Sequence, residues 1–279
     1  MESDRKKTSF CIPGSGLWQF KVLHFGLKGA PATFERLMEK VLAGLTWKIC
    51  LVYLDDIVVF SKTFDEHIKN ISEVCERIRG ANLKLHPSKS ILLQNEVPFL
   101  GHRISKDGIK TDDKKIKAVK DWPTPRNVKD VRSFVGLCSY YRRFAKNFSI
   151  IANPLHQLTK KGRQFQWTPE CDQAFETLKH NLTTAPILGF PMDEGNYTLD
   201  TDASDFGMAG VLSQSQDGVE RVISYFSKTF SKCERNYCVT RKELLVIVNS
   251  IKHFQPTISL EMPVPSQGHY GFHSFPVVD

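Results

Sequence analysis

The chain has 279 residues, of which 41% are hydrophobic, and its 38 Lys and Arg outweigh 30 Asp and Glu to give a net charge of +8. This size and composition predict a globular protein of two or three domains with buried cores. The sequence has neither an uninterrupted apolar run of about 18 residues nor an apolar leader, which argues against a membrane-spanning or secreted protein. Seven scattered cysteines without a Cys-x-x-Cys pair favour an intracellular protein, in cytoplasm or nucleus, over a zinc site or a disulfide framework.

The first hundred residues alternate between strand-like and helical patterns. Two strand-like runs, 8–12 and 17–25, flank a turn rich in Pro and Gly. Pro31 then begins a helix whose apolar residues recur at helical spacing, namely Phe34, Leu37, Met38, Val41, Leu42 and Leu45. A second helix from 65 to 80 precedes strands at 83–93 and 97–104. This order of elements predicts an α+β domain.

Between those two helices, residues 49–60 place the pair Asp55-Asp56 between two runs of β-branched and aromatic residues. The pattern predicts a β-hairpin with buried faces, an Asp-Asp centre and two carboxylates at its tip. Because adjacent carboxylates repel, a cation between them is stabilising, and oxygen ligands favour Mg²⁺ or Mn²⁺. An Asp-Asp pair is also common in ordinary solvated turns, so the hairpin alone leaves both interpretations open.

From 112 to 182 the pattern is helical, with Asn127 and Thr168 as expected N-caps. Between 101 and 163, 16 Lys and Arg stand against 5 Asp, a local excess of +11. Basic groups interleaved with aromatic rings suit a nucleic-acid backbone, although a basic segment is more often a solvated face. The interleaved aromatic residues are Trp122, Tyr140, Tyr141, Phe144 and Phe148.

A second α/β unit is expected from residue 186. Strands are predicted at 197–201, 206–213 and 219–226, with a turn at Asp217-Gly218, and a helix at 240–254. The last 25 residues, 255–279, contain four prolines, no Lys or Arg and no period. We expect this segment to be a disordered or foreign tail.

Several motifs carry a family resemblance. Tyr53-Leu54-Asp55-Asp56, framed by apolar strands, resembles the active-site box of reverse transcriptases of the gypsy-type LTR retrotransposon and retrovirus group. Ala30-Pro31-Ala32-Thr33-Phe34 and Phe99-Leu100-Gly101-His102 are similar to flanking motifs of that family. Thr201-Asp202-Ala203-Ser204 and Lys242-Glu243-Leu244-Leu245 look like ribonuclease H signatures. The resemblance runs from about residue 6 to 254.

This resemblance implies an α+β reverse transcriptase palm at 1–110, a helical thumb and connection at 111–185, and an incomplete ribonuclease H-like α/β domain at 186–254. Its expected ligands are Mg²⁺ or Mn²⁺, deoxynucleotides and an RNA/DNA template-primer duplex. Metal ligands by similarity are Asp55 and Asp56 for polymerisation, and Asp202 and Glu243 for RNA cleavage. Nucleotide or primer contacts by similarity are Phe25, Gly26, Tyr53, Lys89, Phe99, Leu100, Gly101 and His102.

Each assignment has an ordinary alternative. Phe25 and Phe99 could be core residues, Lys89 a surface charge, Asp202 a strand-end cap and Glu243 a solvated helix residue. The family also carries a third palm aspartate on an upstream strand, whereas here only Asp4 precedes residue 10. A further ribonuclease H carboxylate is expected near residue 268, inside the expected tail.

The sequence therefore predicts a retroelement polymerase fragment, truncated at both ends and catalytically impaired, that retains nucleic-acid binding through 101–163. One alternative is an active reverse transcriptase whose metal site is completed by another group or a partner chain. A second is a non-catalytic, exapted module that binds nucleic acid or protein. A third is a fragment that never folds stably.

Overall fold

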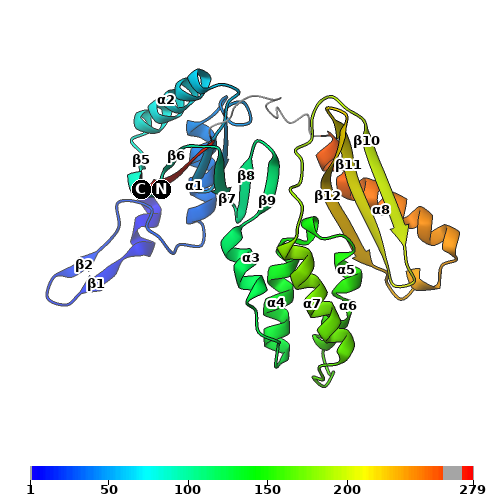
Figure 1. Ribbon diagram of the computed structural model, residues 1–279. Coiled ribbons are helices and arrows are strands. Elements are labelled where there is room, and N and C mark those ends of the chain that lie inside the picture. Colours follow the sequence, from blue (N-terminus) through cyan, green and yellow to red (C-terminus); the bar gives the residue numbers. More distant parts are fainter. Residues whose placement is uncertain (1, 260–271, 279) are drawn as a thin grey trace. The chain divides into compact units, whose positions relative to one another are not determined.

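The structure, a computed structural model, describes residues 2–259 and 272–278 (Figure 1). The chain divides into two units. The first comprises Met1–Phe60, Asp65–Leu92 and His273–Asp279, and the second comprises Ser61–Phe64 and Leu93–Phe272.

The first unit is an α+β assembly, as the sequence predicts. Its strands β3 and β4 form an antiparallel hairpin, and residues of α1 and α2 bury their apolar faces with it. Its elements are η1 (Glu2–Thr8), β1 (Phe10–Ile12), β2 (Gly16–Trp18), α1 (Ala30–Val41), β3 (Cys50–Tyr53), β4 (Asp56–Val59), α2 (Phe64–Gly80), β5 (Lys84–Leu85), η2 (Pro87–Lys89) and β6 (Ile91–Gln94).

The core of this unit follows from helical periodicity. Met38 and Leu42, one turn apart near the end of α1, are fully buried, and Val74 and Ile78 repeat this spacing in α2. They pack with Cys50, Ile57 and Val59 of the hairpin. Leu37, which the periodicity also placed on the apolar face, is 41% exposed. The two helices thus pack against the strands of the hairpin, whereas Tyr53 and Asp55 at its tip are exposed.

Part of the segment 255–279, expected to be a disordered or foreign tail, has regular secondary structure. Helix α8 continues to Ser259, and Phe272–Val278 form β13, whereas 260–271 lie outside the described residues. β13 pairs antiparallel with β4, where Pro276 lies opposite Asp56, and with β5, giving the order β3-β4-β13-β5. An unpaired strand edge exposes backbone donors and acceptors, so an aperiodic segment can complete the sheet.

The second unit begins with a three-stranded antiparallel sheet and continues into helices. Asn127 caps α4 by accepting a hydrogen bond from the Asp130 amide, as predicted, whereas Thr168 makes no side-chain capping bond to α7. The elements are β7 (Glu96–Phe99), β8 (His102–Ser105), β9 (Gly108–Thr111), α3 (Asp113–Lys120), α4 (Val128–Tyr140), η3 (Arg142–Phe144), α5 (Phe148–Ile151), α6 (Asn153–Leu158) and α7 (Pro169–Thr183).

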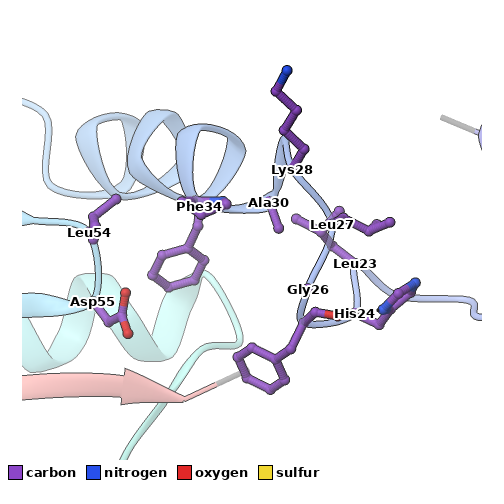
Figure 2. A pocket seen from close by; sticks show the side chains of 11 residues that line it. Leu23, His24, Gly26, Leu27, Lys28, Ala30, Phe34, Leu54 and Asp55 are labelled. Carbon is purple, nitrogen blue, oxygen red and sulfur yellow. Dashed lines mark hydrogen bonds between the residues drawn. The ribbon is translucent and has the colours of Figure 1, made fainter. Parts of the chain in front are cut away.

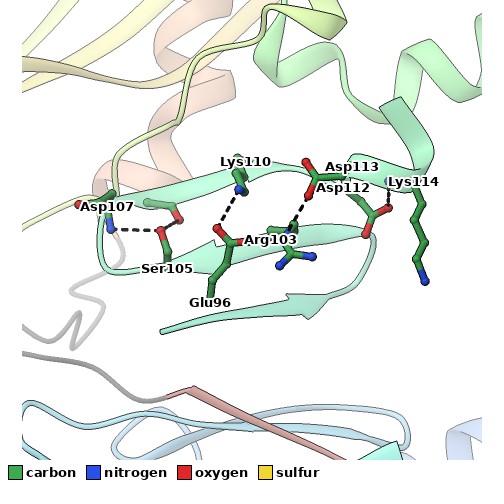
Figure 3. A network of polar contacts seen from close by, with 9 residues as sticks. Glu96, Arg103, Ser105, Asp107, Lys110, Asp112, Asp113 and Lys114 are labelled. Carbon is green, nitrogen blue, oxygen red and sulfur yellow. Dashed lines mark hydrogen bonds and ion pairs between the residues drawn. The ribbon is translucent and has the colours of Figure 1, made fainter. Parts of the chain in front are cut away.

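Ion pairs between neighbouring strands link the sheet of β7, β8 and β9 (Figure 3). Glu96 accepts from Arg103 and lies 2.8 Å from Lys110, while Arg103 also lies 3.7 Å from Asp113 at the start of α3. Burial raises the pKa of Glu96, but the ion pairs with Lys110 and Arg103 outweigh it and lower the pKa overall. Ion pairs therefore link the three strands that carry the turn between β7 and β8.

The remainder of the second unit is a three-stranded antiparallel sheet with a helix against it. The strands β10 (Tyr197–Ala203), β11 (Gly207–Gln216) and β12 (Val219–Thr229) lie side by side, followed by η4 (Glu234–Asn236) and α8 (Val239–Ser259) (Figure 1). Asp217 and Gly218 both have positive φ, so the predicted Asp-Gly hairpin turn is confirmed. Phe254 of α8 packs with Leu212 and Ile223 of the sheet.

Candidate functional site

The tip of the β3–β4 hairpin is a two-residue turn, but its centre differs from the expected Asp-Asp pair. Tyr53 pairs with Asp56, so the turn residues are Leu54 and Asp55, and Asp56 is the first residue of β4. Leu54 has a φ of 52°, as the first turn residue of a type II′ hairpin requires. Glycine usually occupies this position, so a leucine there stores backbone strain of about 1–3 kcal/mol.

A carboxylate from α1 supports this strained turn. The Leu54 amide donates a hydrogen bond to Glu35, which is half-buried one turn into the helix. Local sequence patterns do not predict this role, because the contact joins residues 19 apart in the chain. The only signal available was a carboxylate beside the inward-facing Phe34 on a predicted amphipathic helix. Glu35 therefore links the helix to the hairpin tip.

Replacing Glu35 by Ala should loosen the tip. The turn amide would lose a charge-assisted hydrogen bond, which is worth about 1.5–3 kcal/mol. We expect faster hydrogen exchange at Leu54 and a lower free energy of unfolding, measured by exchange mass spectrometry and urea denaturation. Glu39→Ala, at an exposed position one turn further along the same helix, is the control. Equal behaviour of the two variants would contradict a supporting role for Glu35.

The two aspartates differ in environment. Asp55 is exposed and Asp56 is half-buried. Burial raises the pKa of Asp56, and the neighbouring charge of Asp55 raises it further. Such a pair fits a divalent cation, because the ion supplies the positive charge that the carboxylates lack. No group of three or more His, Cys, Asp or Glu side chains that could hold a metal occurs among residues 2–259.

A pocket of about 370 Å³ opens beside the hairpin tip (Figure 2). The loop before α1 forms one wall with Phe25 and Gly26, and Leu54 and Asp55 form another. Phe25 is 82% exposed, which excludes its alternative role as a core residue. The structure thus brings the expected nucleotide-contacting residues Phe25 and Gly26 to the same pocket as one carboxylate. Tyr53, at the end of β3, is 51% exposed, and Lys89, at the end of η2, is exposed.

The expected primer-contacting residues form the β7–β8 turn in the second unit. Phe99 pairs with His102, and both turn residues, Leu100 at 47° and Gly101 at 68°, have positive φ. This geometry is that of a type I′ turn. Burial and the nearby charge of Arg143 lower the pKa of His102. Phe99 is half-buried at the end of its strand.

The expected ribonuclease H-like ligands lie on two elements of the second unit. Asp202 lies on the exposed face of β10, whereas Glu243 is half-buried in the first turns of α8. Lys242, beside Glu243, lies 3.2 Å from Asp205, so an ion pair ties α8 to the end of β10. The carboxylate expected near residue 268 lies outside the described residues.

Comparison with known proteins identifies the family. Residues 1–104 match the family of reverse transcriptases (RNA-dependent DNA polymerases), and residues 167–262 match the RNase H-like domain found in reverse transcriptase. The retrovirus-related Pol polyproteins from the Drosophila melanogaster transposons opus and 297 are 39% and 41% identical over 265 and 255 residues, each covering 91% of this chain. The chain therefore carries a region of the reverse transcriptase family and an RNase H-like region, and its homologues are retrotransposon Pol polyproteins. The resemblance to gypsy-type elements is thereby confirmed.

The chain spans only part of these relatives, namely 26% of the opus polyprotein and 24% of the 297 polyprotein. Solved structures agree with the fold. A foamy viral protease-reverse transcriptase in complex with double-stranded DNA is 25% identical, with a TM-score of 0.81 over 92% of this chain and 45% of that one. The same viral enzyme with an RNA/DNA hybrid is 26% identical, with a TM-score of 0.78 over 95% of this chain and 35% of that one.

The basic segment 101–163 differs in part from its expected role. Tyr141, Phe144 and Phe148 are buried core residues, so their rings are not available to stack on bases. Arg142 donates to the Ser227 carbonyl, and burial lowers the pKa of Arg143. Tyr140, which is 51% exposed, and the lysines of α3 remain on the surface. Of the helices the structure describes, none has the length and apolar character to span a bilayer.

Acid is expected to destabilise the second unit through His102, His156 and His253. Burial is the main cause that lowers the pKa of each, and the charges of Arg142 or Arg143 add to it. Histidine in the unfolded chain has a pKa of 6.5, so below this pH the unfolded chain binds protons more readily than the folded chain does. The contribution of these histidines to the free energy of unfolding is fully present above the unfolded pKa. It is lost as pH falls through their folded pKa values.

We expect the Tm of the second unit to fall as pH is lowered from about 7 to about 5. His253→Gln should flatten this dependence, whereas His180→Gln, at an exposed position on α7, is the control. Calorimetry across this pH range checks the prediction, and a Tm that rises towards acid would contradict it.

Proposed function

We propose that this chain binds an RNA/DNA template-primer duplex and adds deoxynucleotides at the tip of the β3–β4 hairpin. The observation that carries the proposal is the pocket in which Phe25 and Gly26 face the turn that bears Asp55. A hairpin tip with two carboxylates beside a pocket of this size suits a nucleotide triphosphate held with a metal ion. The foamy viral enzymes bound to double-stranded DNA and to an RNA/DNA hybrid support a duplex as the ligand.

The residues of the chain have distinct proposed roles. Asp55 and Asp56 would hold Mg²⁺ or Mn²⁺, and Glu35 keeps their turn in place. Phe25 and Gly26 would contact the incoming nucleotide, Tyr53 would lie under the primer end, and Lys89 would assist the triphosphate. When bound, a divalent cation would neutralise the negative charge that develops as the primer hydroxyl displaces pyrophosphate. Reverse transcriptases and ribonuclease H enzymes generally use such ions.

We propose that this chain binds the duplex but incorporates deoxynucleotides only slowly. Asp55 and Asp56 supply ligands for one ion, whereas two ions about 3.5–4 Å apart need further bridging ligands. A third ligand from another group or a partner chain would raise the activity. The RNase H-like region, with Asp202 and Glu243, is proposed to contact the duplex rather than to cleave its RNA strand efficiently.

The test is primer extension on an RNA template with a DNA primer, in Mg²⁺ and then Mn²⁺, combined with a salt titration of duplex binding. We expect affinity to fall steeply with salt and incorporation to be weak and lost in Asp55→Asn. Asp65→Asn, exposed in the first turn of α2, is the control. Strong incorporation would favour an active enzyme with a completed metal site. Binding that is indifferent to salt would overturn the proposed duplex interaction.

A further inference from the structure

The β7–β8 turn has a conformation that its sequence does not favour. Leu100 and Gly101 both have positive φ, and leucine adopts such a backbone rarely because its Cβ crowds the following carbonyl. A hairpin turn of this kind usually contains Asn or Asp followed by Gly. Something outside the turn must therefore compensate for the strain at Leu100.

Two consecutive tyrosines at the end of α4 make that compensating contact. The Tyr141 hydroxyl donates to the Gly101 carbonyl at 2.6 Å, and the Tyr140 hydroxyl donates to the Leu100 carbonyl. Each bond joins residues 40 positions apart. Both peptide carbonyls of the strained turn thus have a donor from the same helix end.

The space around Gly101 is filled by one of these side chains. A Cβ atom at this position would lie 3.1 Å from the Tyr140 Oη atom and 3.3 Å from its Cε1 atom. The turn and the tyrosine therefore fit together closely, and Gly101 is required both for its φ and for this approach. The contact limits the turn to one backbone conformation.

Aromatic packing extends the contact to His102. The imidazole stacks on the Tyr140 ring at 5.2 Å with an interplanar angle of 11°, and it meets the Tyr141 ring edge-on at 5.5 Å. Tyr141 is fully buried, and burial raises its pKa to about 12, so its hydroxyl stays protonated as a donor at neutral pH. Tyr140 is 51% exposed, so its outer edge faces solvent next to the turn.

We propose that Tyr140 and Tyr141 are positioning residues that hold the Phe99–His102 turn in the shape needed to place the primer 3′ end. This inference rests on the proposed function, in which that turn contacts the primer. The tyrosines act through the turn: their hydroxyls fix its two carbonyls and their rings fix the orientation of His102. The helical region is thereby coupled directly to the primer terminus.

The experiment compares Tyr140→Phe, Tyr141→Phe and Tyr225→Phe in the full chain. Tyr225 is a matched control because it is half-buried in the same unit and its hydroxyl makes no hydrogen bond within the described part of the chain. Hydrogen exchange of the Gly101 and His102 amides reports the order of the turn. A 2-aminopurine base at the primer 3′ end reports how the terminus is held, and it requires no turnover.

We expect the Tyr140 and Tyr141 variants to speed exchange at the turn by about tenfold, the effect of losing one hydrogen bond. The 2-aminopurine signal of the bound duplex should shift towards that of free duplex, while overall duplex affinity stays close to that of Tyr225→Phe. Where incorporation is measurable, kcat should fall more than the KM for the nucleotide rises.

Unchanged exchange at the turn would overturn the contact, and faster exchange with an unchanged 2-aminopurine signal would overturn the positioning role. If the wild-type chain binds duplex without incorporating nucleotide, only the catalytic part of the proposed function fails, and the fluorescence result still decides this inference. If the wild-type chain binds no duplex, both proposals fail together.

Discussion

Replacing Asp56 by Asn is expected to abolish metal-dependent incorporation while making the protein more stable at neutral pH. The variant keeps the size of the side chain but removes one of the two anionic metal ligands at the hairpin tip. Loss of a residue that merely orients a ligand costs about 10–100-fold, so loss of a ligand should cost about 100-fold or more. Single-turnover primer extension in Mg²⁺ and Mn²⁺ measures this effect.

The stability gain follows from the raised pKa of Asp56. The folded chain binds the carboxyl proton of Asp56 more tightly than the unfolded chain does, in which the pKa of this group is 3.8. The contribution of Asp56 to stability is therefore greatest below pH 3.8 and is lost as pH rises through the folded pKa. At pH 7 the ionised carboxylate of Asp56 is destabilised by burial and by repulsion from Asp55. The neutral amide of Asp56→Asn removes both effects and should raise Tm.

With a divalent cation present, the wild-type chain should become more stable than Asp56→Asn. Mg²⁺ or Mn²⁺ is expected to raise the Tm of the wild-type chain, because the ion binds only the folded site, and to leave Asp56→Asn nearly unchanged. Asp65→Asn should respond to the ion as the wild type does. A cation-induced rise of equal size in Asp56→Asn would contradict a metal site at the hairpin tip.

A large loss of stability is expected for Gly108→Ala. Gly108 has a φ of 131°, and a Cβ atom there would lie 2.1 Å from the backbone oxygen of Leu188. That oxygen accepts a hydrogen bond from the Ile109 amide at 2.8 Å, and the Leu188 amide returns one to Ile109 at 2.9 Å. Backbone strain and overpacking each cost about 1–3 kcal/mol, so a combined loss of about 3 kcal/mol or more is expected.

Urea denaturation followed by circular dichroism checks this loss in the second unit. Gly136→Ala is the matched control, since Gly136 lies in α4 with nothing within 4 Å of its added Cβ atom. In a helix, alanine is favoured over glycine by up to about 1 kcal/mol, so the control should be neutral or stabilising. Similar losses in both variants would show that the contact with Leu188 is not decisive.

Local sequence patterns determined most of the secondary structure of this protein. The spacing of Met38 and Leu42 predicted the buried face of α1, the Asp217-Gly218 pair predicted a hairpin turn, and Asn127 predicted the start of α4. These features depend on side-chain periodicity or on a single turn, so the residues that decide them are close together in the chain. The motif around Asp55 indicated the family on the same local basis.

Features that depend on distant residues were decided only by the tertiary structure. Glu35 reaches the Leu54 amide, Tyr141 reaches the Gly101 carbonyl, and β13 pairs with β4 across more than two hundred residues. The burial of aromatic residues in the basic segment likewise depended on packing, because the same aromatic residues suit either a core or a nucleic-acid surface. A one-dimensional pattern records which groups can form hydrogen bonds or pack, whereas the fold selects their partners, since every buried donor and acceptor must be satisfied at once.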